Sequence, residues 1–194
     1  MDVSGLFDEN PELRGTSIEA MVQAIERTSV FVATGMPGGD DFDRRSRLLL
    51  RFFEIDEGER RQLMIRRSEP ASNRMYRGYY QSPPEQHFSH LEYFDIGPER
   101  SAQYPPLRDA GMFAEPNVWP VRQPVEGWRA AMVSHFGIME NLALAILRGL
   151  ARAFDLPLHE VDKRFADGNS TLRLLRYPPR LRDTIVENEE AVAA

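Results

Sequence analysis

A long apolar periodicity in the middle of the chain constrains the fold more than any other feature. Within residues 124–154, apolar side chains recur every three or four positions: Trp128, Met132, Phe136, Met139, Ala143, Ile146, Leu150 and Phe154. This spacing places them along one side of an α-helix. Asp155-Leu156-Pro157 then ends the helix, because proline cannot continue one. We therefore predict a long core helix from Pro124 to Phe154.

Helical patterns dominate before this segment, and strands are few. Thr16 and Glu19 have the spacing of a capping box, which predicts a helix over residues 16–29. Asp56 and Glu59 indicate another capped helix start. The other predicted elements are helices over 41–53, 56–64 and 157–165, strands over 30–34, 90–96 and 171–177, loops over 66–86 and 101–123, and a frayed tail over 182–194.

This order of elements, helices first and then few strands, indicates an α+β fold. Only one convincing strand follows the long helix, whereas a complete jelly roll needs several more. With 194 residues, the chain is long enough for one domain with a sizeable core, or for two small ones.

Composition excludes several classes of function. The formal net charge of −6 argues against a general nucleic-acid binder, because phosphate binding needs a basic surface. The absence of cysteine excludes disulfides, zinc–thiolate sites and thiol nucleophiles. The N-terminus lacks the pattern of a signal peptide. The most apolar stretch, Leu142–Leu150, is interrupted by Arg148 and is too short to span a bilayer. We expect a cytoplasmic protein without nucleic-acid or membrane partners.

Five short motifs occur in an order that resembles one enzyme family. They are Asp2-Val3-Ser4, Gly78-Tyr79-Tyr80, Glu92-Tyr93-Phe94-Asp95-Ile96-Gly97, Asn117-Val118-Trp119-Pro120 and the strand-like segment from Leu172 to Pro179. Together they resemble the N-terminal part of the isopenicillin N synthase-like family of non-haem iron oxygenases. The resemblance implies a helical layer followed by the first strands of a jelly-roll (double-stranded β-helix) barrel. It divides the chain into an N-terminal region (1–123), a region with the long helix and a short one (124–165), and a first barrel strand with its tail (166–194).

The family binds Fe(II) through two histidines and one carboxylate, and 2-oxoglutarate through an R-x-S motif. Both lie beyond the strand that Leu172–Pro179 resembles, and no histidine follows Pro179 here. We therefore expect a barrel that is incomplete in this chain, no metal ligands, and no Fe(II) or 2-oxoglutarate bound by the chain alone. The H-x-E pair His90 and Glu92, with His135 or His159 as a third ligand, is a less favoured metal site, because two of the histidines fall on predicted helices.

Four residues are candidates for binding a substrate or cosubstrate. By resemblance, Tyr177 occupies the place of a tyrosine that hydrogen-bonds a carboxylate, and Tyr80 that of a tyrosine lying over the substrate. On a strand, Thr171, Arg173 and Tyr177 share one face. Arg173 on that face would bind a carboxylate bidentately. Arg176 points the other way and is expected to pair with an acidic neighbour.

Three interpretations of function follow. The first is the N-terminal segment of an Fe(II) oxygenase that oxidises a small or peptide-like substrate with O2; isopenicillin N synthase itself uses no 2-oxoglutarate, so use of this cosubstrate stays open. The second is a non-catalytic binding or assembly module, or one half of a split enzyme, existing as a homo-oligomer or with a second chain supplying the barrel. The third is an unrelated α+β domain.

Overall fold

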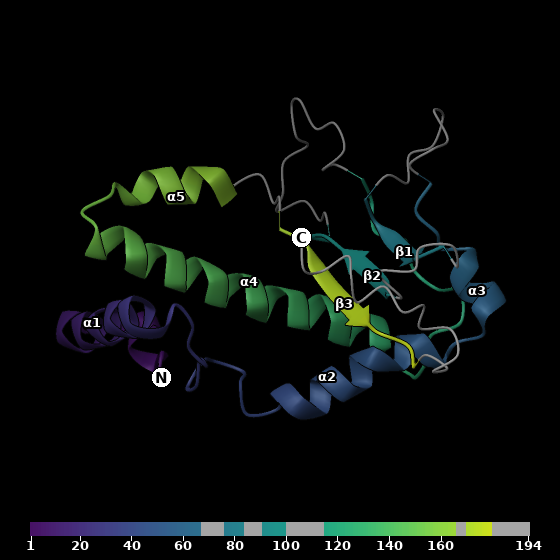
Figure 1. The fold of residues 1–194 in the computed structure, drawn as a ribbon, viewed down its shortest axis with the longest axis horizontal. Helices are drawn as coiled ribbons and strands as arrows, with labels where there is room; N and C mark the ends of the chain where they lie inside the picture. The colour runs from purple at the N-terminus through teal and green to yellow at the C-terminus, as the bar shows by residue number, and fades with distance from the viewer. Residues whose placement is uncertain (67–75, 84–90, 100–114, 166–169, 180–194) are drawn as a thin grey trace, which may run out of the picture.

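The computed structural model describes residues 1–66, 76–83, 91–99, 115–165 and 170–179. Along the chain the elements are the 3-10 helix η1 (Ser4–Phe7), α1 (Pro11–Thr28), α2 (Phe42–Leu50), the 3-10 helix η2 (Arg51–Glu54), α3 (Glu57–Arg61), β1 (Gly78–Gln81), β2 (Glu92–Ile96), α4 (Trp128–Ala153), α5 (Leu158–Phe165) and β3 (Leu172–Arg176). Figure 1 shows α4 running through the molecule, with α1 beside its C-terminal half and the sheet near its start. The predicted α+β class is confirmed in the described residues.

The long helix is confirmed, although it begins at Trp128 rather than Pro124. Trp128, Met132 and Phe136 are buried in the main apolar cluster. Farther along, Ala143 and Phe154 were expected on the buried side but are exposed. The reason is the neighbour: α1 crosses α4 at Gly149, where the Met21 side chain approaches, so burial shifts to Gly149 and Ala151 instead of following the apolar repeat.

α4 also contradicts the expectation that no segment is long and apolar enough to cross a bilayer. It has 26 residues, with a mean hydropathy of 1.5 over its most apolar window. The sequence analysis considered only Leu142–Leu150. The helix is apolar on both sides of that stretch, so its most apolar window is longer than expected. Core helices of soluble proteins meet the same criterion, and the first turns of α4 lie in the core.

The three strands form an antiparallel sheet in the order β1-β2-β3. Tyr79 pairs with Phe94, and Phe94 with Leu174, so these three side chains share one face. That face packs against Phe52 of η2 and Trp128 of α4. The main cluster thus takes residues from all three regions proposed from the sequence.

Two strand predictions need correction. Residues 30–34 form no strand; a single parallel bridge joins Asp2 to Thr34, and Val30 and Val32 are largely exposed. Residues 30–34 are rich in strand-favouring side chains, but no neighbouring strand among the described residues pairs with them. Conversely, β1 falls inside the segment predicted as a loop, because its four residues become a strand only by pairing with β2.

Helix boundaries also differ. α1 begins at Pro11, capped by the Asn10 side chain, which accepts a hydrogen bond from the Glu12 amide at 2.9 Å. Thr16 lies inside the helix and donates back to the Glu12 carbonyl, so it does not cap. α3 begins after Asp56 as predicted, but ends at Arg61 rather than Met64. Much of the predicted loops, and the tail over 182–194, lie outside the described residues.

Candidate functional site

The sheet face turned away from the core carries an aromatic and charged cluster. Tyr80 of β1 and Tyr93 of β2 are register partners, and their rings stack with centroids 4.8 Å apart. The Arg173 guanidinium of β3 lies 3.7 Å from the Tyr93 ring centroid. The pairing of the three strands therefore brings Tyr80, Tyr93 and Arg173 together. The alternation of side chains along β1 or β3 alone does not predict that they are neighbours.

Asp95 holds Arg173 in place. Arg173 donates from Nε and Nη2 to the two carboxylate oxygens of Asp95, at 2.9 and 2.8 Å. The hydrogen bonds to Asp95 raise the pKa of Arg173. Because a guanidinium has five N–H donors, two bonds to Asp95 leave others for a ligand, and the Arg173 side chain is 47% exposed. The sequence did not identify Asp95, since its pairing with Arg173 depends on strand register.

Thr171 and Tyr177 flank β3 and are less closely integrated. The Thr171 hydroxyl accepts a hydrogen bond from Arg77 Nη1 at 2.6 Å, so a buried arginine engages it. Tyr177 follows the strand and is 68% exposed. The structure thus brings Arg173 and Tyr80 together through Tyr93, but shows no contact between Tyr177 and either of these described residues.

The motif residues around this face have structural roles. The Asn117 side chain accepts from the Gly97 amide at 2.7 Å and donates to the Gly97 carbonyl at 2.8 Å. Trp119 Nε1 donates to Glu99, while Arg129 pairs with Glu99 and lies over the Trp119 ring. These contacts tie the end of β2 to the start of α4, so Asn117 and Trp119 hold this loop in place.

Gly78 is required by backbone geometry. Its φ is 122°, and a Cβ there would lie 2.3 Å from the Leu63 carbonyl oxygen. The segment before β1 can therefore approach β1 closely, and the Tyr79 amide donates to that same carbonyl at 2.8 Å.

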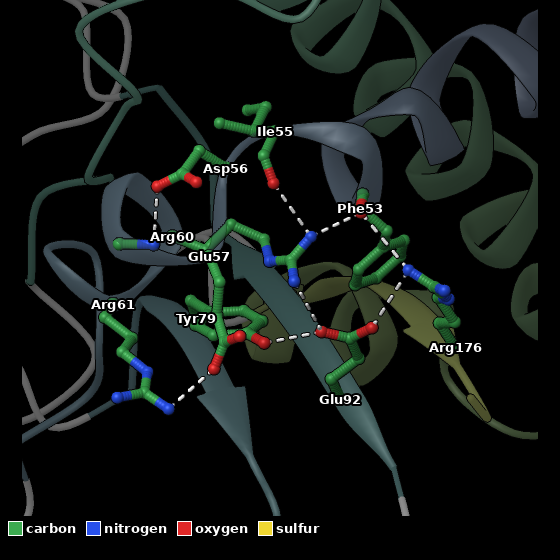
Figure 2. Close-up of polar contacts among 10 residues, drawn as sticks. Phe53, Ile55, Asp56, Glu57, Arg60, Arg61, Tyr79, Glu92 and Arg176 are labelled. Atoms are coloured by element: carbon green, nitrogen blue, oxygen red, sulfur yellow. Dashed lines mark hydrogen bonds and ion pairs between the residues drawn. The ribbon is translucent and has the colours of Figure 1, made fainter. Parts of the chain in front are cut away.

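A buried polar cluster on the core side of the sheet was missed by the sequence analysis (Figure 2). The Glu92 side chain is 4% exposed. It accepts a hydrogen bond from the Tyr79 hydroxyl at 2.5 Å and forms an ion pair with Arg176 at 3.2 Å, and Arg60 lies 3.9 Å away. Burial, then the bond to Glu92, raises the pKa of Tyr79, which keeps the phenol protonated.

The two arginines of this cluster also bind η2. Arg60 and Arg176 both donate to the Phe53 carbonyl, and Arg60 donates to the Ile55 carbonyl at 2.9 Å. The predicted acidic partner of Arg176 is thus confirmed as Glu92. The available signal was alternation: Glu92 shares a face with Phe94, so a carboxylate on the buried face required cationic partners.

The histidines do not form a metal site in the described residues. His135 is buried beside Phe42, with ring centroids 5.6 Å apart, and His159 is exposed beside Glu160. His87 and His90 lie outside the described residues. Within the ranges that the structure describes, no group of three or more His, Asp or Glu side chains could hold a metal ion. The prediction that the chain alone binds no iron stays a prediction.

Comparisons with known proteins point in one direction. No protein-family profile matches the chain. It is 31% identical over 87 residues to the 2-oxoglutarate-dependent dioxygenase imqE of Aspergillus flavus, covering 45% of this chain and 21% of that protein. It is 28% identical over 181 residues to isopenicillin N synthase of Hapsidospora chrysogena, covering 92% of this chain and 53% of the synthase. The chain thus spans from about a fifth to about half of the length of these curated relatives.

Solved structures agree on the fold. A C-terminally truncated protein from Neurospora crassa, crystallised in its apo form, matches with a TM-score of 0.67 and 21% identity, over 92% of this chain and 61% of that one. A putative 2OG-Fe(II) oxygenase family protein from Caulobacter crescentus matches with a TM-score of 0.68 and 19% identity, over 93% of this chain and 56% of that one. Sequence and fold therefore point the same way: the chain is similar in sequence to curated 2-oxoglutarate-dependent dioxygenases and to isopenicillin N synthase, and it shares its fold with a putative 2OG-Fe(II) oxygenase family protein.

Proposed function

We propose that the chain is the N-terminal segment of a non-haem Fe(II) oxygenase that oxidises a small or peptide-like substrate with O2 and 2-oxoglutarate. Support comes from the curated names of its relatives and from the full-length form of the Neurospora crassa protein, which was solved in complex with alpha-KG and thymine. The observation that carries the proposal is the outer sheet face, where Tyr80, Tyr93 and Arg173 form a stacked cluster.

In this proposal the outer face binds and orients a carboxylate. Arg173 is pre-positioned by Asp95, so its remaining N–H donors can bind a substrate or 2-oxoglutarate carboxylate without first being ordered. Tyr80 supplies an aromatic surface beside it, while the hydroxyls of Tyr177 and Thr171 add hydrogen bonds from the two ends of β3. The Asp95 carboxylate offsets the positive charge of Arg173, so binding in this proposal relies on directed hydrogen bonds more than on net charge.

In this proposal the iron is bound by residues other than those that the structure describes. In the complete enzyme Fe(II) activates O2 for oxidation of an unactivated carbon. The described residues contain no suitable set of ligands, so no chemical step is assigned to them. We therefore propose that this chain is inactive alone and that the metal-binding part of the barrel is supplied by further sequence or by a second polypeptide.

The test is reconstitution. The segment is produced with the polypeptide encoded directly downstream, and 2-oxoglutarate-dependent formation of succinate is followed under air with Fe(II). Activity in the combined protein, but not in the 194-residue chain, is the expected result. Arg173→Gln should raise the KM for the carboxylate ligand about tenfold or more, since a charge-assisted bond contributes about 1.5–3 kcal/mol. The matched control Arg164→Gln changes an exposed arginine on α5 and should leave KM unchanged.

A non-catalytic assembly module is the second candidate, favoured by the outer edge of β3. Among the described strands, β3 pairs only with β2. An open edge of this kind binds a strand from another chain. If no reconstituted protein forms succinate while the chain retains a defined oligomer, this second function is supported instead.

A further inference from the structure

A basic groove lies between α2 and the first half of α4. Its hollow has a volume of about 540 Å³ and is lined by Asp41, Arg44, Arg45, Arg47, Leu48, Arg51, Ala131 and Ser134. Ser134 also lines an adjoining hollow of about 580 Å³, together with Glu99, Gln123, Gly127, Arg129, Ala130 and Val133, and Glu99 there already pairs with Arg129. The two hollows therefore form one surface, which we call the α2–α4 groove, with small and apolar residues between its arginines.

The charge of this groove is positive although the chain is acidic overall. Arg44 pairs with Asp41 at 2.8 Å, and Arg51 with Glu54 at 2.9 Å. Arg45 donates to the Gly38 carbonyl, and Arg47 makes no hydrogen bond or ion pair with the described part of the chain. Two guanidinium charges are thus left without carboxylates among the described residues. The two existing pairs are exposed and weak, so their arginines can exchange partners.

The sequence after β3 has the complementary chemistry. Residues 183–194 contain the carboxylates of Asp183, Glu187, Glu189 and Glu190, the apolar side chains of Ile185, Val186 and Val192, and no lysine or arginine. An acidic segment with apolar side chains matches a groove with apolar floor and basic rim.

The last described strand before this segment, β3, ends close to the groove. Arg176, the last residue of β3, donates to the Phe53 carbonyl at 3.2 Å, and Phe53 belongs to η2, which directly continues α2. Figure 1 shows the end of β3 beside this region. A chain of 12 residues can reach about 40 Å, whereas the nine residues of α2 span only about 13 Å.

We propose that residues 183–194 bind the α2–α4 groove of their own chain, with their carboxylates on Arg44, Arg47 and Arg51. A short tether gives an effective concentration in the millimolar range, so a weak electrostatic contact suffices. The inference does not depend on the proposed oxygenase function. It assigns to the tail a regulated contact that high salt, or a competing acidic partner, would release.

Paramagnetic NMR of the full chain tests this directly. Because the chain has no cysteine, Asn188→Cys gives a single site for a nitroxide label. The expected result is selective loss of amide signal in Arg44–Arg51 of α2 and η2, with α5 unaffected. At about 1 M salt, where the Debye length is about 3 Å, the lost α2 signals should return. Uniform or absent signal loss would overturn the proposal.

Variants and mixing complete the test. Arg47→Glu, and separately Glu187→Gln with Glu189→Gln and Glu190→Gln, should restore the α2 signals in the labelled protein. The matched control Arg164→Glu, an exposed charge reversal on α5, should leave the signal loss intact. Mixing spin-labelled unenriched chain with unlabelled ¹⁵N chain should give no α2 loss. If this mixture shows the same α2 loss as the labelled ¹⁵N chain, the contact forms between chains and the proposal fails. Failure of reconstituted oxygenase activity would not affect any of these signals.

Discussion

At the scale of single residues, the sheet separates two kinds of arginine. Arg173 lies on the outer face, half-exposed, with Asp95 and an aromatic ring. Arg176 lies on the inner face with the buried Glu92. The sequence predicted that these two side chains point to opposite faces, because side chains alternate between the two faces of a strand. Their partners could not be predicted, because Asp95 and Glu92 become neighbours only through the register of β2 and β3.

The buried Glu92 provides a prediction at this scale. Glu92→Gln leaves the poorly exposed Arg60 and the partly exposed Arg176 without a carboxylate. Breaking a buried pair costs about 3–5 kcal/mol, and water around Arg176 reduces this, so we expect a loss of about 2–3 kcal/mol in the free energy of unfolding. Urea denaturation measures it. Glu54→Gln, which breaks an exposed pair with Arg51, is the control and should cost less than about 1 kcal/mol. Equal effects of the two substitutions would contradict a structural role for the cluster.

At the scale of elements, sequence patterns correctly predicted the features that depend only on nearby residues. The apolar repeat of α4 and the Asp56 cap of α3 were both found from sequence, because each depends on residues within a few turns. β1 was missed and residues 30–34 were wrongly predicted as a strand, because strands exist only through partners distant in sequence. Sequence reasoning named Tyr80 and Arg173, but the same limit hid Tyr93 and Asp95, which join them only through strand pairing.

The packing of α2 on α4 gives a pH-dependent prediction. Burial, with a smaller contribution from Arg45, lowers the pKa of His135, so the folded chain holds this imidazole neutral. When pH falls below about 6.5, the unfolded chain takes up a proton that the folded chain resists, and stability falls. Above that pH both states are neutral and the effect vanishes.

Thermal and urea unfolding between about pH 7.5 and 5.5 measure this effect. The free energy of unfolding should decrease toward acid by at most about 1.4 kcal/mol per pH unit from this one group. His135→Gln should flatten the pH dependence, whereas His159→Gln, which alters the exposed histidine of α5, should not. A slope unchanged in His135→Gln would show that other groups control acid stability.

At the scale of the whole molecule, the edge of the sheet is the feature most able to bind another chain. In the described residues β3 is an edge strand, with Leu175 39% exposed on the outer face. Edge strands carry unpaired N–H and C=O groups that pair with other chains, while Pro178 and Pro179 limit the length of this one. We therefore expect the isolated 194-residue chain to form a soluble oligomer at micromolar concentration.

Size exclusion with light scattering measures the mass of this oligomer. Leu175→Lys places a charge on the edge and should shift the chain toward monomer, whereas Leu175→Thr, which keeps a strand-favouring residue, should not. A wild-type monomer with strongly protected amides from Leu172 to Arg176 would contradict the prediction, because it would mean that the chain covers this edge itself.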